Sequence, residues 1–83
     1  MIVRLYETPG CGLCAEAFDA LARLGRGRAF STERVDVSAD PLLLARYALR
    51  VPVLAAHGNE LDAAGLSDGA IARWLGEVMR SAP

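Results

Sequence analysis

The sequence predicts an α/β protein of 83 residues whose elements follow the order β-α-β-α-β-β-α. Short runs of β-forming residues alternate with longer segments whose apolar residues recur every three or four positions. Glycine, proline and aspartate separate these segments, as is typical of turns. The last two strands follow each other directly. We therefore expect a parallel pair of strands joined by a right-handed connection, with an antiparallel hairpin beside it.

The first half of the chain predicts one βαβ unit. Residues 2–6 form an apolar run of β-formers and predict the first strand. Residues 8–10 are turn formers, and a helix is expected from Cys11 until the glycines at positions 25 and 27 end it. Residues 33–37 predict the second strand, with a start as early as Phe30. The helical spacing predicts an inward face made of Cys14, Phe18, Leu21, Ala22 and Gly25.

The second half predicts two helices around a hairpin. Asp40 is a favoured helix N-cap, and Pro41 is a favoured first helical residue. A helix is therefore expected from 41 to about 49, and Leu42 and Leu49 follow its apolar spacing. Residues 51–55 predict the third strand, 57–59 a turn and 60–62 the fourth strand. Ser67 is expected to cap the last helix, which turns one apolar side inward: Ile71, Trp74, Leu75, Val78 and Met79.

Length and composition narrow the classes of function. The 83 residues fit a single domain, 1–83, and an apolar share of 53% supplies its core. A net charge of −1 argues against a nucleic-acid surface and a polybasic membrane contact. No apolar run approaches the roughly 20 residues that span a bilayer, and the N-terminus lacks the features of a signal peptide. We expect a soluble, cytoplasmic monomer with neither a nucleic-acid nor a membrane partner.

The two cysteines, Cys11 and Cys14, stand where the first strand passes into the first helix. Thiols at this spacing can close and reopen a disulfide. At a helix N-terminus, unpaired N–H groups and the helix dipole favour a thiolate, and cysteine pKa values of about 3.5–7.5 are common there. We predict that Cys11 is the exposed nucleophile and that Cys14 resolves the mixed disulfide. Gly10 and Gly12 leave room for a substrate backbone or tripeptide.

Two other interpretations of the cysteines stay open. Free cysteines often pack in a core as small hydrophobic residues. A Cys-x-x-Cys pair also binds zinc, but a structural zinc site takes four ligands and only His57 would be available to join the two thiolates. We therefore expect no bound metal.

Residues 8–14 (Thr-Pro-Gly-Cys-Gly-Leu-Cys), residues 50–54 (Arg-Val-Pro-Val-Leu) and the order of elements resemble the glutaredoxin family of the thioredoxin superfamily, in particular a small glutaredoxin-like group. The resemblance covers nearly the whole chain. It implies a thioredoxin-like fold, a four-stranded mixed sheet with helices on both faces. It also implies a cis Val51–Pro52 bond facing the cysteines. That bond would turn the Val51 backbone outward, so that its N–H and C=O pair with an extended substrate.

The resemblance further implies where a substrate lies. In glutaredoxins, glutathione follows the Val-Pro backbone and its γ-glutamyl end reaches the start of the last helix. That place holds Ser67 and Asp68 here, for which helix capping is the alternative role. Gly12 and Leu13 replace the usual Pro-Tyr between the cysteines and are predicted to contact substrate. Glu7, if it lies close, would raise the pKa of the thiol.

These inferences predict a thiol–disulfide oxidoreductase acting on protein disulfides or glutathione mixed disulfides. Glutathione is a candidate co-substrate, and no permanently bound cofactor is expected. Two alternatives are a glutathione-dependent iron–sulfur or metal carrier and a catalytically inactive binding module with the same fold.

Overall fold

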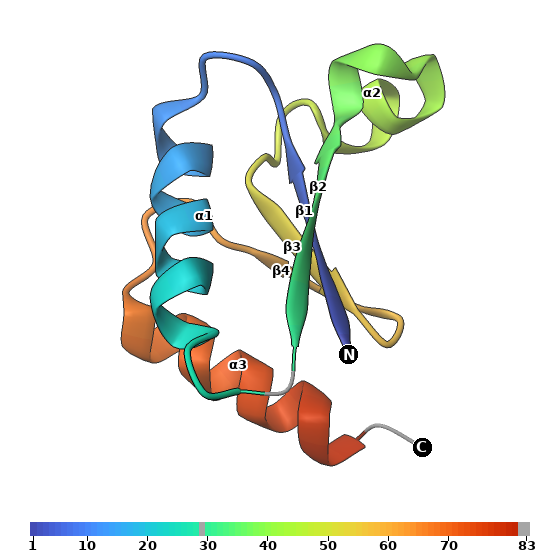
Figure 1. The fold of residues 1–83 in the computed structure, drawn as a ribbon. Coiled ribbons are helices and arrows are strands. Elements are labelled where there is room, and N and C mark those ends of the chain that lie inside the picture. The colour runs from blue at the N-terminus through green and yellow to red at the C-terminus, as the bar shows by residue number, and fades with distance from the viewer. Residues whose placement is uncertain (29, 82–83) are drawn as a thin grey trace.

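The computed structural model describes residues 1–28 and 30–81, so positions 29, 82 and 83 of the predicted 1–83 domain lie outside the described residues. The strands are β1 (Ile2–Glu7), β2 (Ser31–Asp36), β3 (Val53–Ala56) and β4 (Asn59–Asp62). The helices are α1 (Gly12–Leu24), α2 (Pro41–Tyr47), α3 (Asp68–Ser81) and the short 3-10 helix η1 (Val37–Ala39) that leads into α2. The predicted order of elements is confirmed (Figure 1).

The four strands form one mixed sheet in the order β2-β1-β3-β4. β1 and β2 are parallel, whereas β3 is antiparallel to both β1 and β4. This arrangement confirms the predicted parallel pair and hairpin. Because β1 and β2 run in the same direction, their carboxyl ends meet at one end of the sheet, with Glu7 opposite Asp36. The chain turns from that end into α1, which begins beside the cysteines.

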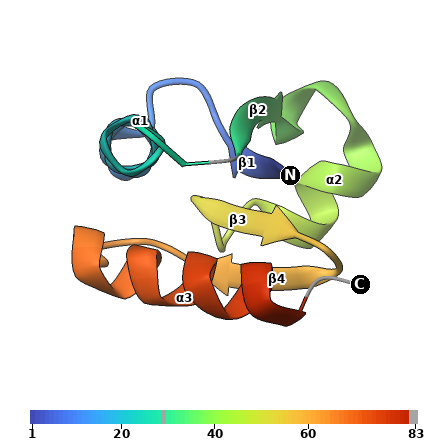
Figure 2. The same ribbon diagram turned by 60° about the horizontal axis from the view of Figure 1, so that its bottom comes forward.

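Two apolar cores lie on opposite faces of the sheet, as the alternation of side chains along a strand requires. Leu5 of β1 and Leu54 of β3 belong to the larger core, which α1 and α3 cover. Tyr6 and Val53, their neighbours in sequence, belong to the smaller core with Tyr47 of α2. Figures 1 and 2 show α2 on the side of the sheet away from α1 and α3. Helices therefore cover both faces, as predicted.

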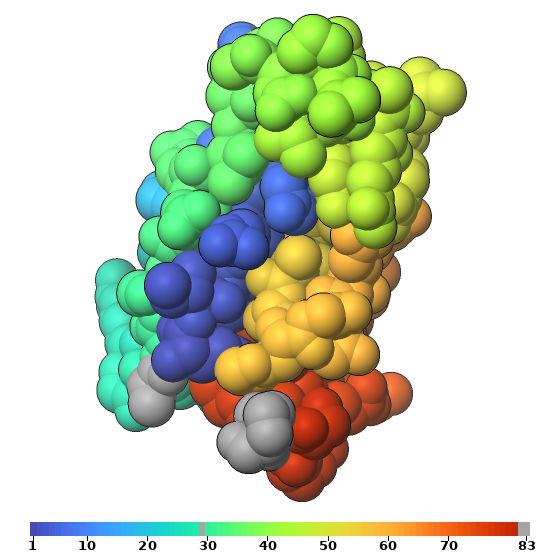
Figure 3. All heavy atoms as spheres, turned by 90° about the vertical axis from the view of Figure 1, so that its right-hand side faces the viewer, coloured from blue at the N-terminus to red at the C-terminus, as the bar shows by residue number. Residues whose placement is uncertain are grey.

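The helix α2 is short and covers only one end of its face. Figure 3 shows α2 in green at the top, with β1 in blue and the β3–β4 hairpin in yellow and orange forming an open surface below it. Within the described residues, no helix has the length and apolar character needed to cross a membrane.

Local capping signals fix the starts of α2 and α3. The Asp40 carboxylate accepts a hydrogen bond of 2.8 Å from the N–H of Leu42, and Pro41 is the first residue of α2. The Ser67 hydroxyl oxygen accepts a bond of 3.1 Å from the N–H of Ala70. Both predicted N-caps are confirmed.

Several predictions about element bounds and side-chain burial are wrong. β3 begins at residue 53, two residues after its predicted start, whereas β2 begins at residue 31, within the range expected for it. Ala22 is exposed, and α1 instead buries Ala17 and Ala20 because it packs against α3 as well as the sheet. Leu42 is 82% exposed and Leu49 is fully exposed, because α2 contacts the sheet through Leu43 and Tyr47, one turn apart.

Candidate redox site

Cys11 and Cys14 are joined by a disulfide at the start of α1, and their Cα atoms lie 5.2 Å apart. Gly10, just before the pair, has a φ of 73°, a left-handed conformation that suits glycine and turns the chain from β1 into the helix. Cys11 is half-buried, whereas Cys14 is fully buried. The interpretation as two unconnected core cysteines is therefore wrong, and Cys11 holds the more accessible sulfur.

The backbone of α1 presents a hydrogen-bond donor to the accessible sulfur. Cys11 is the N-cap of α1, and its Sγ accepts a hydrogen bond of 3.1 Å from the N–H of Cys14. The first turn of α1 contains no acidic residue. Donors of this kind and the positive end of the helix dipole favour the charged form of a thiol after reduction. The local geometry thus fits a thiolate at Cys11.

The bond between Val51 and Pro52 is cis, as predicted. Pro52 is buried. Because Val53 pairs with Tyr6, the start of β3 lies at the end of the sheet from which β1 turns into α1 (Figure 1). The N–H of Val51 donates a bond of 3.0 Å to the carbonyl of Tyr47, because the chain folds back on the last residue of α2. This N–H is therefore already bonded within the chain, and its pairing with a substrate stays a prediction.

Arg50 ties the segment before Pro52 to the edge strand β4. Its Nη2 lies 2.8 Å from an oxygen of Asp62 and 2.9 Å from Oε1 of Glu60. The second oxygen of Glu60 accepts a bond of 2.6 Å from the Tyr47 hydroxyl, and the Tyr47 ring stacks on Tyr6 with centroids 4.2 Å apart. Burial and the bond to a carboxylate raise the pKa of Tyr47 to about 12. This network holds α2 and the cis-proline segment in one arrangement.

Acidification is expected to weaken this network. The Tyr47 hydroxyl, and then Arg50, hold the pKa of Glu60 below its ordinary value of 4.5. Since the folded-state pKa is the lower one, the stabilisation is complete above that ordinary value and is lost as pH falls through the folded-state pKa. We expect Glu60→Gln to lose less unfolding free energy than the native chain between about pH 7 and about pH 3, measured by urea unfolding.

The matched control for the acid experiment is Glu77→Gln, which changes an exposed carboxylate on α3. It should follow the pH profile of the native chain. A native-like acid loss in Glu60→Gln would contradict the role given to Glu60.

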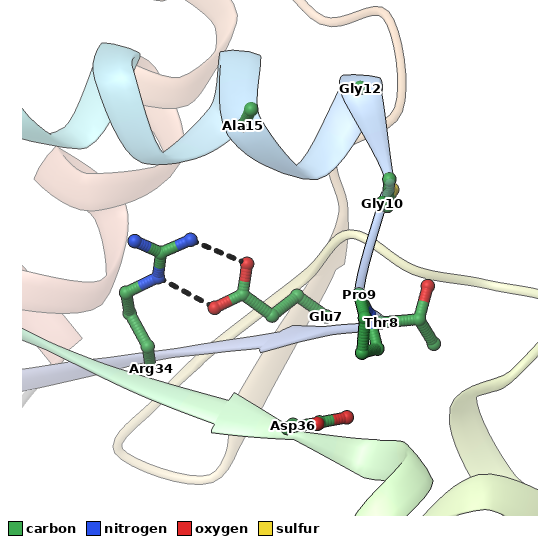
Figure 4. A pocket seen from close by; sticks show the side chains of 9 residues that line it. Glu7, Thr8, Pro9, Gly10, Gly12, Ala15, Arg34 and Asp36 are labelled. Atoms are coloured by element: carbon green, nitrogen blue, oxygen red, sulfur yellow. Dashed lines mark hydrogen bonds and ion pairs between the residues drawn. The ribbon is translucent and has the colours of Figure 1, made fainter.

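An open pocket of about 470 Å³ lies beside Cys11, at the carboxyl ends of β1 and β2. We call it the β2-side groove; residues 7–12, Ala15, Arg34 and Asp36 line it. Arg34 donates to both carboxylate oxygens of Glu7, at 2.6 and 2.9 Å, and Figure 4 shows the two groups face to face. Glu7 does lie near Cys11, but it is paired with Arg34 and does not act on the thiol as a lone charge.

Sequence reasoning missed Arg34 and Asp36 as residues of this site. The signal that would have found them is the parallel pairing of the first two strands, whose carboxyl ends meet at one crevice. The Arg34 guanidinium also lies 4.1 Å above the ring of Phe18, which links β2 to the middle of α1. Asp36 points away from the Arg34–Glu7 pair in Figure 4.

A second groove, of about 280 Å³, runs along α1 from Leu13, which lies between the cysteines, to Arg23. We call it the α3-side groove; its other lining residues are Glu16, Ala17, Asp19, Ala20, Ala63, Gly65, Leu66 and Asp68. Gly12, the other residue between the cysteines, lines the β2-side groove instead. The two residues predicted to contact substrate from within the motif therefore face different grooves.

Ser67 and Asp68 have structural roles at the start of α3. Ser67 is the N-cap, the alternative role given for it above. Asp68 accepts two hydrogen bonds from Arg23, at 2.8 and 3.0 Å, so Arg23 is an ion-pair partner. Arg23 follows Cys11 by twelve residues, which is about 18 Å along a helix. The fold therefore brings Val51 and Pro52 toward the cysteines but leaves Asp68 paired near the far end of α1.

His57 lies in the turn after β3, at the end of that strand opposite Pro52. A strand of four residues is about 13 Å long, so His57 stands well away from the cysteine end of the sheet. Across residues 1–28 and 30–81, no cluster of three His, Cys, Asp or Glu side chains is placed to hold a metal ion. The zinc interpretation finds no third ligand in this part of the chain.

Three features together define a thioredoxin-superfamily protein. They are the mixed β2-β1-β3-β4 sheet with helices on both faces, the Cys-x-x-Cys disulfide at the start of α1, and the cis-proline before β3. The chain belongs to the glutaredoxin-like domain family (DUF836), whose sequence model matches residues 2–76. The predicted glutaredoxin-like resemblance and the thioredoxin-like fold are thus confirmed.

Solved structures agree with this assignment. The chain is similar to protein XcR50 from X. campestris: its X-ray structure shares 36% identity and a TM-score of 0.76 over 90% of this chain and 96% of that one. The solution structure of the same protein shares 35% identity and a TM-score of 0.71 over 93% of this chain and 95% of that one. A mutant thioredoxin from Halobacterium salinarum NRC-1 shares the fold at 19% identity and a TM-score of 0.72, over 99% of this chain and 77% of that one. No curated protein matches this sequence.

Proposed function

We propose that this protein is a thiol–disulfide oxidoreductase in which Cys11 is the nucleophile and Cys14 the resolving cysteine. One observation carries the proposal. The disulfide stands at the N-terminus of α1, where Cys11 is half-buried and lines a groove and Cys14 is fully buried. The hydrogen bond from the Cys14 N–H to the Cys11 sulfur supports the assignment of the nucleophile.

The reaction proceeds in two exchange steps. The Cys11 thiolate attacks one sulfur of a substrate disulfide, forms a mixed disulfide and releases the first substrate thiolate. Cys14 then loses its proton and attacks the Cys11 sulfur, which releases the second thiolate and closes the Cys11–Cys14 disulfide. The substrate gains two electrons and the protein loses two. A cellular dithiol, or two monothiols, must return these two electrons and become a disulfide to complete the cycle.

The substrates we propose are protein disulfides or glutathione mixed disulfides, with glutathione as a candidate reductant. A reducing compartment such as the cytoplasm supplies the thiols that the cycle needs. Both reacting sulfurs belong to one chain, so a monomer suffices. The geometry does not favour an iron–sulfur carrier, because Cys14 forms a disulfide with the sulfur that a cluster would need.

The proposal is tested with bis(2-hydroxyethyl) disulfide, a small uncharged substrate. The protein is reduced, freed of reductant and mixed with this disulfide while released thiol is followed. We expect each protein to release two thiols and to end with Cys11 and Cys14 oxidised, and added dithiothreitol to sustain turnover. Thiol release no faster than in a sample without protein would refute the proposed function.

A further inference from the structure

Both grooves that flank the cysteine pair carry more carboxylates than cations. The β2-side groove contains Glu7 and Asp36 against Arg34. The α3-side groove contains three carboxylates against one guanidinium: Glu16, Asp19 and Asp68 against Arg23. Each groove, one on either side of α1, therefore carries a net negative charge.

The arginine of each groove is already engaged. Arg34 binds Glu7 through two hydrogen bonds, and Arg23 binds Asp68 in the same manner. A guanidinium in such a paired arrangement has directed its fork of donors at one carboxylate. Among the described residues that line the two grooves, no arginine is left with this fork free for a carboxylate of a substrate.

Three carboxylates remain to act on a bound substrate. Glu16 is exposed, and within residues 1–28 and 30–81 it forms no hydrogen bond or ion pair. Asp36 accepts hydrogen bonds from the N–H and hydroxyl of Ser38, which are neutral groups. Asp19 interacts electrostatically with both Arg23 and Arg34, whose positive charges partly balance its own. It is the third carboxylate that can act on a substrate.

Two of these carboxylates, Asp36 and Glu16, lie close enough to Cys11 to influence what reaches it. Cys11 itself lines the β2-side groove together with Asp36. Glu16 follows Cys11 by five residues, about 7.5 Å along a helix. Charges at the surface act over a screening length of about 10 Å at 0.1 M salt. A substrate joined to the Cys11 sulfur therefore contacts a negatively charged surface.

We infer that the site selects disulfides whose reacting cysteine is flanked by lysine or arginine, and that it discriminates against glutathione. This inference rests on the proposed function and names the substrate class of the same site. Glutathione brings two carboxylates and one ammonium group to the sulfur, and oxidised glutathione brings twice that. A basic peptide segment instead complements Glu16, Asp19 and Asp36 and lowers the free energy of the encounter.

The test compares three short peptides that carry arginine, glutamine or glutamate on both sides of one cysteine, each as its mixed disulfide with 2-mercaptoethanol. Second-order rate constants are measured with the reduced protein, and each is divided by the rate with free dithiothreitol to remove differences in intrinsic reactivity. We expect the arginine peptide to react about tenfold faster than the glutamate peptide at about 0.02 M salt. The ratio should fall to about twofold at about 0.5 M salt. Oxidised glutathione should react more slowly than bis(2-hydroxyethyl) disulfide.

A matched pair of variants locates the effect. Glu16→Gln removes an unpaired carboxylate from the α3-side groove, and Glu77→Gln removes one from the exposed face of α3. Glu16→Gln should lower the arginine-to-glutamate rate ratio about threefold, and Glu77→Gln should leave it unchanged. The ratio cancels any change in the pKa of the Cys11 thiol.

Equal rates for the three peptides, or faster reaction with oxidised glutathione, would overturn the inference and leave the proposed function standing. A rate ratio that Glu16→Gln does not change would also overturn it. If the reduced protein reacts with none of these disulfides, including the uncharged one, the proposed function is refuted.

Discussion

Replacing Cys11 with serine is expected to reduce disulfide exchange to the rate measured without protein. A serine hydroxyl is far less acidic than a thiol, so the N–H of Cys14 and the dipole of α1 cannot supply a comparable nucleophile. Cys14 does not replace it, because its side chain is fully buried. The measurement is thiol release from bis(2-hydroxyethyl) disulfide, with circular dichroism to show that the variant is folded.

The matched variant Cys14→Ser separates the two exchange steps. It keeps the nucleophile at the N-cap of α1 but lacks the sulfur that resolves the mixed disulfide. We expect it to release one thiol per protein and to stop with one 2-mercaptoethanol group on Cys11, visible in the intact mass. Exchange by Cys11→Ser at a rate close to the native one would show that another group is the nucleophile.

Replacing Leu54 with alanine is expected to lower the unfolding free energy by about 2–5 kcal/mol. A chain of 83 residues has a total stability of about 4–12 kcal/mol, so this is a large share of it. Leu54 is fully buried and stands opposite Leu5 in the β1–β3 pair, beneath α1 and α3. Its removal leaves a cavity in the larger core that the rigid sheet cannot close.

The control for Leu54→Ala makes the same chemical change at an exposed position. Leu42 of α2 is 82% exposed, so Leu42→Ala should change the unfolding free energy by less than about 0.5 kcal/mol. Both variants are measured by urea unfolding in the oxidised state, so that the disulfide is the same in each. Equal losses in the two variants would contradict the assignment of the core.

The order of elements, the helix caps and the cysteine pair were predictable because their signals are local. Asp40 before Pro41 and Ser67 before α3 are recognised from a few neighbouring residues. The cis Val51–Pro52 bond came from the family resemblance, since its own residues do not require it. The burial of α1 was predicted less well, because the contact of Ala17 and Ala20 with α3 depends on how distant helices pack.

The charged pairs around the site were not predictable from the sequence. Arg34 and Glu7 are 27 residues apart, and Arg23 and Asp68 are 45 apart. Each pair forms only when the fold brings the carboxylate to the arginine, and no local sequence pattern predicts that contact. The hydrogen bond from the Val51 N–H to the carbonyl of Tyr47 was unpredictable for the same reason, because it depends on where α2 ends.

The central claim is that Cys11 and Cys14 interconvert between dithiol and disulfide while the protein stays folded. The most direct measurement equilibrates the protein in thiol–disulfide buffers of increasing potential and counts the alkylated cysteines by mass. We expect one reversible transition between two alkylated cysteines and none, the same from either direction, with a midpoint between about −270 and −120 mV. Cysteines that alkylate at every potential, or a disulfide that no dithiol reduces in the folded chain, would contradict it.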